Sequence, residues 1–276
     1  MRKSLLIGAA ALSMAYTAQA VAEMPAVTGF NGKVEGGYGQ LDGEDNFAVG
    51  GSVAIPLIEQ LGIQIDANAG MLGENEDFTY GAGLSTFWRS SSIGSFGVSV
   101  AYLDVDEAAW ISRYEAEGEV YLGNITLGGD FGFQDSDWGD DGAFYGGAKI
   151  TLYAMPNLAL TGGADVFGFD GDEDVQANLG VEFGVLDMLS LYADGKLGSE
   201  SEDSIFVGAR LAFGSNSTDL IKQHREYSKR GNAVNDMLRE NDTFLKNAAA
   251  VNAVIAAGGS CPIPSPLDPL CLLPIF

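Results

Sequence analysis

Histidine is almost missing from the 276-residue chain, in which His224 is the only one. A lipase or protease that uses an imidazole base needs a histidine close to its nucleophile. His224 follows the part of the sequence that alternates like β-strands, so it is not available at the rim of a β domain. Adjacent carboxylates could act as acid and base, but in segments this acidic they pair by chance. We therefore expect no enzymatic activity and no cofactor.

Positive charge is scarce. The chain has 14 Lys and Arg against 38 Asp and Glu, which gives a formal net charge of -24 at pH 7. Binding to a nucleic-acid backbone needs clustered Lys and Arg. The composition therefore excludes nucleic acid as a partner.

Long apolar runs are also absent: no stretch of 18 apolar residues occurs, so the sequence predicts no transmembrane helix. The apolar run at residues 5–14 is shorter, follows Arg2 and Lys3, and precedes the small-x-small sequence Ala18-Gln19-Ala20. This arrangement predicts a signal peptide over residues 1–20. Ala20-Val21-Ala22 is an equally good cleavage site, and the lack of a cysteine after the run argues against a lipoprotein. We expect an exported protein.

Cysteine occurs only twice, as Cys261 and Cys271 near the C-terminus. In an oxidising compartment the natural interpretation is a disulfide that closes a small Pro-rich loop. The alternative is a pair of free thiols in a disordered tail.

What the chain does have, from Val27 to Phe213, is about twelve short segments in strict polar/apolar alternation. Their connections are of two kinds in turn. One kind is acidic and the other is short and almost free of carboxylates; the acidic ones are at 42–45, 74–77, 104–107, 135–141, 170–174 and 200–203, and the short ones at 56–60, 89–93, 122–124, 155–157 and 186–188. Up-and-down strands send every second connection to the same end of a sheet. The pattern predicts an antiparallel meander with two chemically different ends, an asymmetry that a bilayer imposes.

The alternation separates two faces in each strand, one apolar and one small or polar. In the second strand, for example, Phe47, Val49 and Val53 share one face and Asn46 and Ser52 the other. A β-sandwich turns its apolar face inward, whereas a transmembrane barrel turns it outward to lipid. An even strand count and strands of about 11 residues, which cover the hydrocarbon thickness when tilted, favour the barrel over the sandwich.

Aromatic residues gather at the strand ends on the apolar face, as in the interfacial girdles of membrane proteins. They are Phe30, Tyr38, Phe78, Tyr80, Trp88, Tyr102, Trp110, Tyr114, Phe131, Phe133, Phe144, Phe183 and Phe213. The last strand, Ser204 to Phe213, alternates apolar residues (Phe206 and Leu211 among them) and closes on Phe213.

With these features the chain resembles the Gram-negative outer-membrane β-barrels of the porin-like class. The resemblance implies a terminal strand that the barrel-assembly machinery recognises, with Phe206, Leu211 and Phe213 as the signal. In most members the closing aromatic is the last residue of the protein, whereas here some sixty residues follow Phe213; Phe276 is the alternative terminal aromatic. The fold class expected is all-β, an up-and-down transmembrane barrel of about twelve strands over 27–213.

Charged residues at inward positions would line the lumen. They are Lys33, Glu35, Asp66, Arg113, Glu115, Glu117, Glu119, Asp130, Lys149, Asp165, Glu182, Asp194, Lys196 and Arg210. The run from Arg113 to Glu119 carries four charges at a spacing of two, which neither lipid nor a dry core would accept. One interpretation is a salt-bridge ladder with Lys149, Lys196 and Arg210 that fills a narrow barrel. The other, favoured because many inward positions are Gly, is a water-filled, cation-favouring pore.

Two acidic segments come near to calcium motifs without matching them. Asp170, Asp172 and Asp174 lack the Gly that an EF-hand requires in sixth place, where Val175 stands. The segment from Asp135 to Asp140 is out of register as well. We expect no metal site; the weaker alternative is a bridge through divalent ions to phosphates of the outer leaflet.

The composition changes after Ser215, and residues 218–257 predict a helix with Thr218 or Asp219 as its cap. An even strand count puts this tail, 214–276, in the periplasm with the N-terminus. The sequence leaves three alternatives open: a helix that enters or caps the lumen, an arm that tethers a periplasmic partner, and a poorly ordered extension.

Together these features predict a monomeric or trimeric outer-membrane channel that passes small hydrophilic solutes and weakly prefers cations. The lipid and lipopolysaccharide of the outer membrane and the barrel-assembly machinery are the expected partners. The competing hypothesis is a closed structural barrel that displays acidic loops and anchors the helical tail.

Overall fold

The computed structural model describes residues 26–27, 29–41, 44–72, 77–105, 109–136, 142–169, 172–198, 204–214, 217–227, 232 and 234. The signal-peptide segment, both cysteines and the middle parts of the acidic connections lie outside these residues. Within the described part, no helix is long and apolar enough to cross a membrane.

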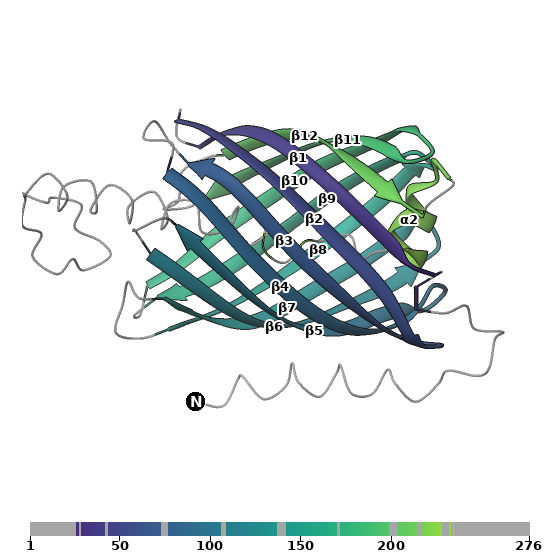
Figure 1. The fold of residues 1–276 in the computed structure, drawn as a ribbon, viewed down its shortest axis with the longest axis horizontal. Helices are drawn as coiled ribbons and strands as arrows, with labels where there is room; N and C mark the ends of the chain where they lie inside the picture. The colour runs from purple at the N-terminus through teal and green to yellow at the C-terminus, as the bar shows by residue number, and fades with distance from the viewer. Residues whose placement is uncertain are drawn as a thin grey trace, which may run out of the picture.

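Twelve antiparallel strands make up one closed barrel (Figure 1). Each strand pairs with its neighbours in sequence, and β12 pairs back with β1 from Gly32↔Phe213 to Leu41↔Ser204. The strands are β1 (Asn31–Leu41), β2 (Glu44–Ile58), β3 (Leu61–Leu72), β4 (Asp77–Ser90), β5 (Gly94–Val105), β6 (Ala109–Leu122), β7 (Ile125–Ser136), β8 (Ala143–Met155), β9 (Leu158–Phe169), β10 (Asp172–Leu186), β11 (Leu189–Gly198) and β12 (Ser204–Phe213). The predicted up-and-down barrel of twelve strands is confirmed.

The faces of the barrel follow the alternation in the sequence. On β3, Ile65 is 50 % exposed while its neighbours Gln64 and Asp66 are 1 % exposed. The same holds around the barrel, because outward positions carry exposed Val, Leu, Ile, Phe and Tyr. An outer surface of this composition is stable against hydrocarbon and would be unfavourable in water. The apolar face therefore points outward, the reverse of a β-sandwich core.

The thirteen aromatic residues predicted for the girdles all lie on this outer face. Several touch across neighbouring strands near the ends that lead to the acidic connections: Phe131 stacks on Phe144 with ring centroids 5.9 Å apart, and Tyr102 on Trp110 at 6.3 Å. Rings at this level suit the interface between lipid and water.

The two ends of the barrel differ as the connections predict. Odd strands are followed by the acidic segments at one end, which we call the loop end. Even strands are followed by two- or three-residue connections at the other, which we call the turn end. At the turn end Gly123 adopts φ +60° between β6 and β7, a conformation that a residue with a Cβ rarely takes.

The chain leaves β12 at the turn end through Gly214, whose φ is +88°. A Cβ there would come within 2.3 Å of the Asn31 side-chain oxygen, so a larger residue would obstruct this bend. The helix α2 (Leu220–Glu226) follows directly and lies at this end of the barrel (Figure 1). It ends where Tyr227 leaves the helical conformation. The single helix predicted over 218–257 is thus interrupted at Tyr227, and most of that span lies outside the described residues.

Candidate functional site: the barrel lumen

The fourteen charged residues predicted for the lumen all stand at inward positions of their strands, between neighbours that face outward. Most of them fall into two groups by their exposure: those on β1 to β3 are buried, and those halfway along β6 to β11 are partly or fully exposed. Two residues of the second set of strands depart from this division, since Arg113 on β6 is 3 % and Glu182 on β10 is 1 % exposed. With these exceptions the lumen has two walls of different character.

The first wall consists of the inward positions of β1 to β4, and we call it the covered wall. Every inward polar side chain described there is 7 % exposed or less. Its charged members are Lys33, Glu35, Asp66 and Arg89, two cations and two anions. Balanced charge fits burial, since an ion removed from water needs an opposite charge or hydrogen bonds to compensate.

The second wall consists of the inward positions halfway along β6 to β11, and we call it the open wall. Its side chains are partly exposed although they face into the barrel, so water reaches this part of the lumen. Six of them are carboxylates and two are ammonium groups: Glu115, Glu117, Glu119, Asp130, Asp165, Asp194, Lys149 and Lys196. The excess of negative charge inside the barrel therefore lies where water can solvate it.

Hydrogen bonds orient the carboxylates of the open wall. Glu115 accepts a hydrogen bond of 2.8 Å from the Tyr145 hydroxyl, and Glu119 accepts from Ser95 at 3.2 Å and from Tyr121 at 3.1 Å. Asp165 accepts from the Asn178 amide. These donors fix the carboxylates along the wall and leave their charge facing the lumen.

Glycines give the open wall its depth. A Cβ at Gly147 would come within 2.2 Å of an Asp165 oxygen and about 3.1 Å of an Asp130 oxygen. The two carboxylates thus lean over Gly147 from the strands on either side. Any larger residue there would displace them.

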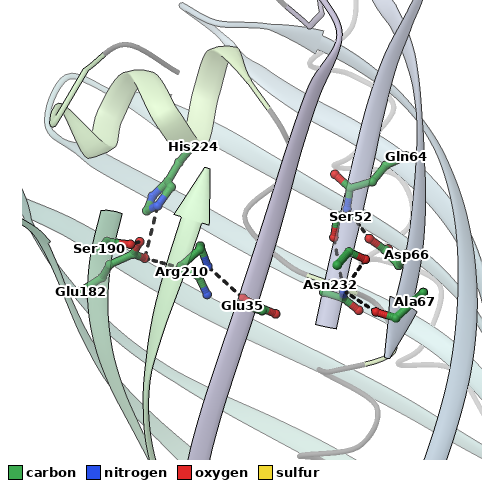
Figure 2. A network of polar contacts seen from close by, with 11 residues as sticks. Glu35, Ser52, Gln64, Asp66, Ala67, Glu182, Ser190, Arg210, His224 and Asn232 are labelled. Carbon is green, nitrogen blue, oxygen red and sulfur yellow. Dashed lines mark hydrogen bonds and ion pairs between the residues drawn. The ribbon is translucent and has the colours of Figure 1, made fainter. Parts of the chain in front are cut away.

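Arg210 joins the two walls, because β12 lies between β11 and β1. Its guanidinium donates to Glu35 at 2.8 Å and to Glu182 at 2.6 Å (Figure 2). It also lies over the Tyr192 ring. The Arg210 side chain is 13 % exposed and those of its two partners 4 % and 2 %. The predicted ladder of Arg210 with the Arg113–Glu119 run does not form: Arg210 pairs with Glu35 and Glu182 instead, since β6 lies on the other side of the barrel.

The helix α2 closes part of the turn-end mouth. Asp219 caps its N-terminus by accepting from the amides of Ile221 and Lys222. The Leu220 amide donates to the Pro156 carbonyl in the β8–β9 turn, and the buried Leu220 side chain packs with Tyr153 and Ala159. A hydrophobic contact and a backbone hydrogen bond therefore fasten the first turn of α2 to the barrel.

Arg225 fastens the last turn. Its guanidinium donates to the carbonyls of Gly123 and Ile125 at 2.8 and 2.9 Å and to the Thr126 hydroxyl at 3.0 Å. It also lies over the rings of Tyr121 and Tyr153. Arg225 is 6 % exposed, so a buried cation is held by carbonyl oxygens and aromatic faces.

Three further contacts join α2 and the residue after it to the barrel at the same mouth. Gln223 donates to the Asp187 carbonyl in the β10–β11 turn, and Arg89 at the end of β4 donates to the Tyr227 carbonyl at 2.9 Å. His224 meets Tyr153 and Glu182 on the inner face, with its ring pointing from the helix toward β10 in Figure 2. The helix is thus bonded to four of the five short turns or the strand ends beside them.

The chain continues into the lumen beyond α2. Asn232, 1 % exposed, donates to the Gly51 carbonyl and the Ser52 hydroxyl at 3.2 Å, halfway along β2 (Figure 2). Val234 is fully buried, and a Cβ at Gly81 on β4 would come within 2.4 Å of it. Gly81 lies nearer the loop end than Ser52 does. Asn232 and Val234 therefore lie inside the barrel against the covered wall, which agrees with the expected alternative of a tail that enters the lumen.

The residues of the predicted assembly signal do not share a face. Phe206 points inward, 7 % exposed, and its ring would touch a Cβ at Gly39. Phe213 points outward and is 46 % exposed. Only Leu211 and Phe213 lie on the lipid side of β12.

Several residues of the lumen are not among the predicted ones. Arg89 falls in a segment that the sequence predicts as a connection. The inward aromatic residues have the same strand parity as the charged ones; they are Phe87, Tyr121, Tyr145, Tyr153, Phe167 and Tyr192. That parity could have found the aromatics. No local signal marks Arg225, His224 and Asn232, because their partners are strands some 70 to 180 positions away.

Comparison with solved structures places the fold in the outer-membrane β-barrel class. A KdgM porin in complex with disordered oligogalacturonate aligns with a TM-score of 0.54 and 8% identity, covering 66% of this chain and 99% of that one. The NanC porin aligns with a TM-score of 0.51 and 7% identity, covering 65% of this chain and 98% of that one. A protein from a study of in-meso crystallization of membrane proteins aligns with a TM-score of 0.55 and 12% identity, covering 73% of this chain and 97% of that one. No protein-family model matches the chain, and no curated sequence matches it either.

Proposed function

We propose that the chain is an outer-membrane, porin-like channel that passes small hydrophilic solutes passively and weakly prefers cations. The open wall is the observation that carries this proposal. Its partly exposed carboxylates outnumber its lysines six to two at a level where the lumen is accessible to water. Rings and stripes of carboxylates favour cations in pores.

The outer surface supports the membrane location. Exposed apolar side chains cover the strands, and aromatic residues flank them toward the ends. Such a surface is matched by lipid and, in the outer leaflet, by lipopolysaccharide. Export through the signal peptide and insertion by the barrel-assembly machinery through β12 are part of the same proposal.

The neighbours named as porins agree with a channel but do not indicate its solute. One of them was solved with oligogalacturonate, a chain of sugar acids. The open wall of this chain would repel a polyanion, because its own charge is negative. Neutral and cationic solutes fit it better.

Planar-bilayer recordings test the proposal. The full-length protein should give discrete openings whose reversal potential in a KCl gradient has the sign of a cation-preferring pore. Replacing Glu115, Glu117 and Glu119 by Gln should move that potential toward zero. The matched control is Asp66→Asn on the covered wall, which should leave it unchanged. A wild-type pore that prefers anions would contradict the proposal.

A second function, a closed structural barrel, is favoured by the docked tail. Arg225 is buried against the β6–β7 turn, and Asn232 and Val234 occupy the lumen beside the covered wall. If the tail seals the barrel, neither the full chain nor a chain that ends at Gly214 would conduct. Conductance in either form excludes this alternative.

The polar groups around Glu182 do not favour hydrolysis. The Ser190 hydroxyl donates to Glu182 at 2.7 Å, and the His224 ring approaches the same carboxylate. Both groups contact the carboxylate (Figure 2), whereas a nucleophilic serine needs the imidazole itself as its base. We therefore propose a non-catalytic role.

A further inference from the structure

The only histidine of the chain lies where the tail docks against the barrel. His224 is 8 % exposed, and its two ring nitrogens face different strands. Nδ1 lies 3.1 Å from the Tyr153 hydroxyl on β8, and Nε2 lies 3.3 Å from Glu182 Oε2 on β10. A group that changes charge near neutral pH is thus buried at a contact between two parts of the chain.

The carboxylate beside His224 belongs to a buried group of charges. Glu182 and Glu35 both accept from Arg210, and Asp194 also acts on that guanidinium. Three carboxylates thus surround Arg210, and a protonated His224 adds a positive charge in contact with Glu182. Removing a carboxylate from water is costly, and a further positive group beside it reduces that cost.

The length of the contact agrees with this argument. Hydrogen bonds between an imidazolium and a carboxylate are typically about 2.7–2.9 Å long. The 3.3 Å between Nε2 and Glu182 leaves room for a closer approach when the ring carries its second proton. The Tyr153 hydroxyl can then accept from Nδ1, so both ring donors would be used.

Other titratable or charged groups near α2 do not replace His224 in this role. Arg225 adds a positive charge on the same helix, but its guanidinium points to the β6–β7 turn and stacks on Tyr121. Arg89, at the end of β4, contacts the Tyr227 carbonyl. Lys222 is exposed to solvent, and the Glu226 carboxylate is only partly buried. Among these described neighbours, Glu182 is the carboxylate in contact with the ring.

We propose that α2 is a pH-sensitive closure of the turn-end mouth, which protonation of His224 fastens to Glu182 and deprotonation loosens. The proposal rests on the channel function, since a closure acts only on a barrel that conducts. Docking favours the protonated ring, so docking is tightest at low pH and weakens as pH rises through the titration of the docked ring. The channel should accordingly open more often at pH 8 than at pH 6.

Docking can be measured without conductance. Hydrogen exchange of the amides at 217–227, corrected for the intrinsic effect of pH, reports how often α2 leaves the mouth of the full-length protein in lipid nanodiscs. From pH 8 to pH 6 the protection of the wild type should rise by about tenfold, because a hydrogen bond between charged groups is stronger than one between neutral groups.

His224→Gln should abolish the rise, and Glu182→Gln should reduce it. Glu226→Gln is the matched control on the same helix and should keep most of it. Arg225→Gln should lower protection at both pH values and keep the ratio between them. Unheated gel mobility verifies that each barrel has folded. A rise in protection that survives His224→Gln, or no rise in the wild type, would overturn the closure.

Recordings at pH 6 and pH 8 separate this proposal from the channel proposal. If exchange depends on His224 but no variant conducts, docking is pH-sensitive and the channel function fails, so the closure fails with it. If the protein conducts and neither openings nor exchange depends on His224, the channel stands and the closure alone is wrong. Openings and exchange that both respond to pH through His224 support the two proposals together.

Discussion

The covered wall and the open wall come from the same alternation of polar and apolar residues, yet only the open wall remains in contact with water. The covered wall has balanced charges, so the tail can lie along it without leaving a net charge buried. The open wall has six carboxylates and two lysines, and no balanced arrangement would allow it to be covered. The distribution of charge around the barrel thus agrees with the position of Asn232 and Val234 beside the covered wall. Under the proposed channel function, solute would pass along the open wall.

The largest expected effect is at Arg210, where the walls meet. Arg210→Met removes the guanidinium that bonds to the buried carboxylates of Glu35 and Glu182, and loss of one partner from such a cluster costs about 3–5 kcal/mol. The free energy of unfolding in urea with lipid vesicles measures it. The control is Lys196→Met on the open wall, which is partly exposed and should cost less than about 1 kcal/mol. Equal losses in the two variants would show that the walls do not differ in burial.

Arg225→Gln should come next, because it releases the tail from the barrel. The variant loses the hydrogen bonds from the guanidinium to the Gly123 and Ile125 carbonyls. A hydrogen bond that involves a charged group contributes about 1.5–3 kcal/mol to stability. Proteolysis of the tail in the folded barrel should become faster by about tenfold or more. Lys222→Gln, exposed on the same helix, should change little. A tail as resistant in Arg225→Gln as in the wild type would contradict docking through this residue.

A smaller effect is expected from reversing one charge on the open wall. Lys149→Glu should raise the ratio of cation to anion permeability by about two- to fivefold, since charges a few ångström apart in water interact by about 1 kcal/mol or less. Lys33→Gln on the covered wall should not alter that ratio. Reversal potentials in a salt gradient measure both. A shift in selectivity in the Lys33 variant, with none in the Lys149 variant, would contradict the difference between the covered wall and the open wall.

The smallest effect concerns the outer part of α2. Partial burial raises the pKa of Glu226, Asp219 adds to the rise, and Lys222 opposes it. A carboxyl whose pKa is raised in the docked state favours docking below its ordinary titration range and loses that contribution as pH rises through the docked pKa. Glu226→Gln should remove this dependence and strengthen docking at neutral pH by less than about 0.5 kcal/mol, because solvent screens a partly exposed group. Hydrogen exchange of the α2 amides between pH 4 and pH 7 measures this effect. Weaker docking of α2 in Glu226→Gln than in the wild type at pH 7 would contradict this role of Glu226.

The strands, their closure and their faces could be predicted from the sequence, because apolar and polar side chains alternate with a period of two residues along each strand. Gln64 and Asp66, for example, could turn inward only together, and Ile65 had to turn the other way. The alternation of acidic and short connections gave the two ends for the same reason. These features depend on local pattern and on chain order alone.

The placement of the tail could not be predicted in the same way. Arg225 is fastened by carbonyls of Gly123 and Ile125, which every turn presents whatever its sequence. Asn232 likewise bonds to backbone oxygen on β2 and β3. Since these partners are independent of side-chain identity, the sequence left a lumen plug, a tether and a loose extension equally open. The burial of Ser52 beneath Asn232 could not be predicted for the same reason.

Thiol labelling of two matched inward serines tests the central claim most directly. Ser52 on β2 is 3 % exposed and contacts Asn232, whereas Ser99 on β5 is partly exposed and stands opposite Glu115. In a full-length background with Cys261 and Cys271 replaced by Ser, Ser99→Cys should react with a small hydrophilic thiol reagent about tenfold or more faster than Ser52→Cys, because reaction follows exposure. Ending the chain at Gly214 should bring the two rates together. Equal rates in the full-length protein would contradict a lumen with one covered and one open wall.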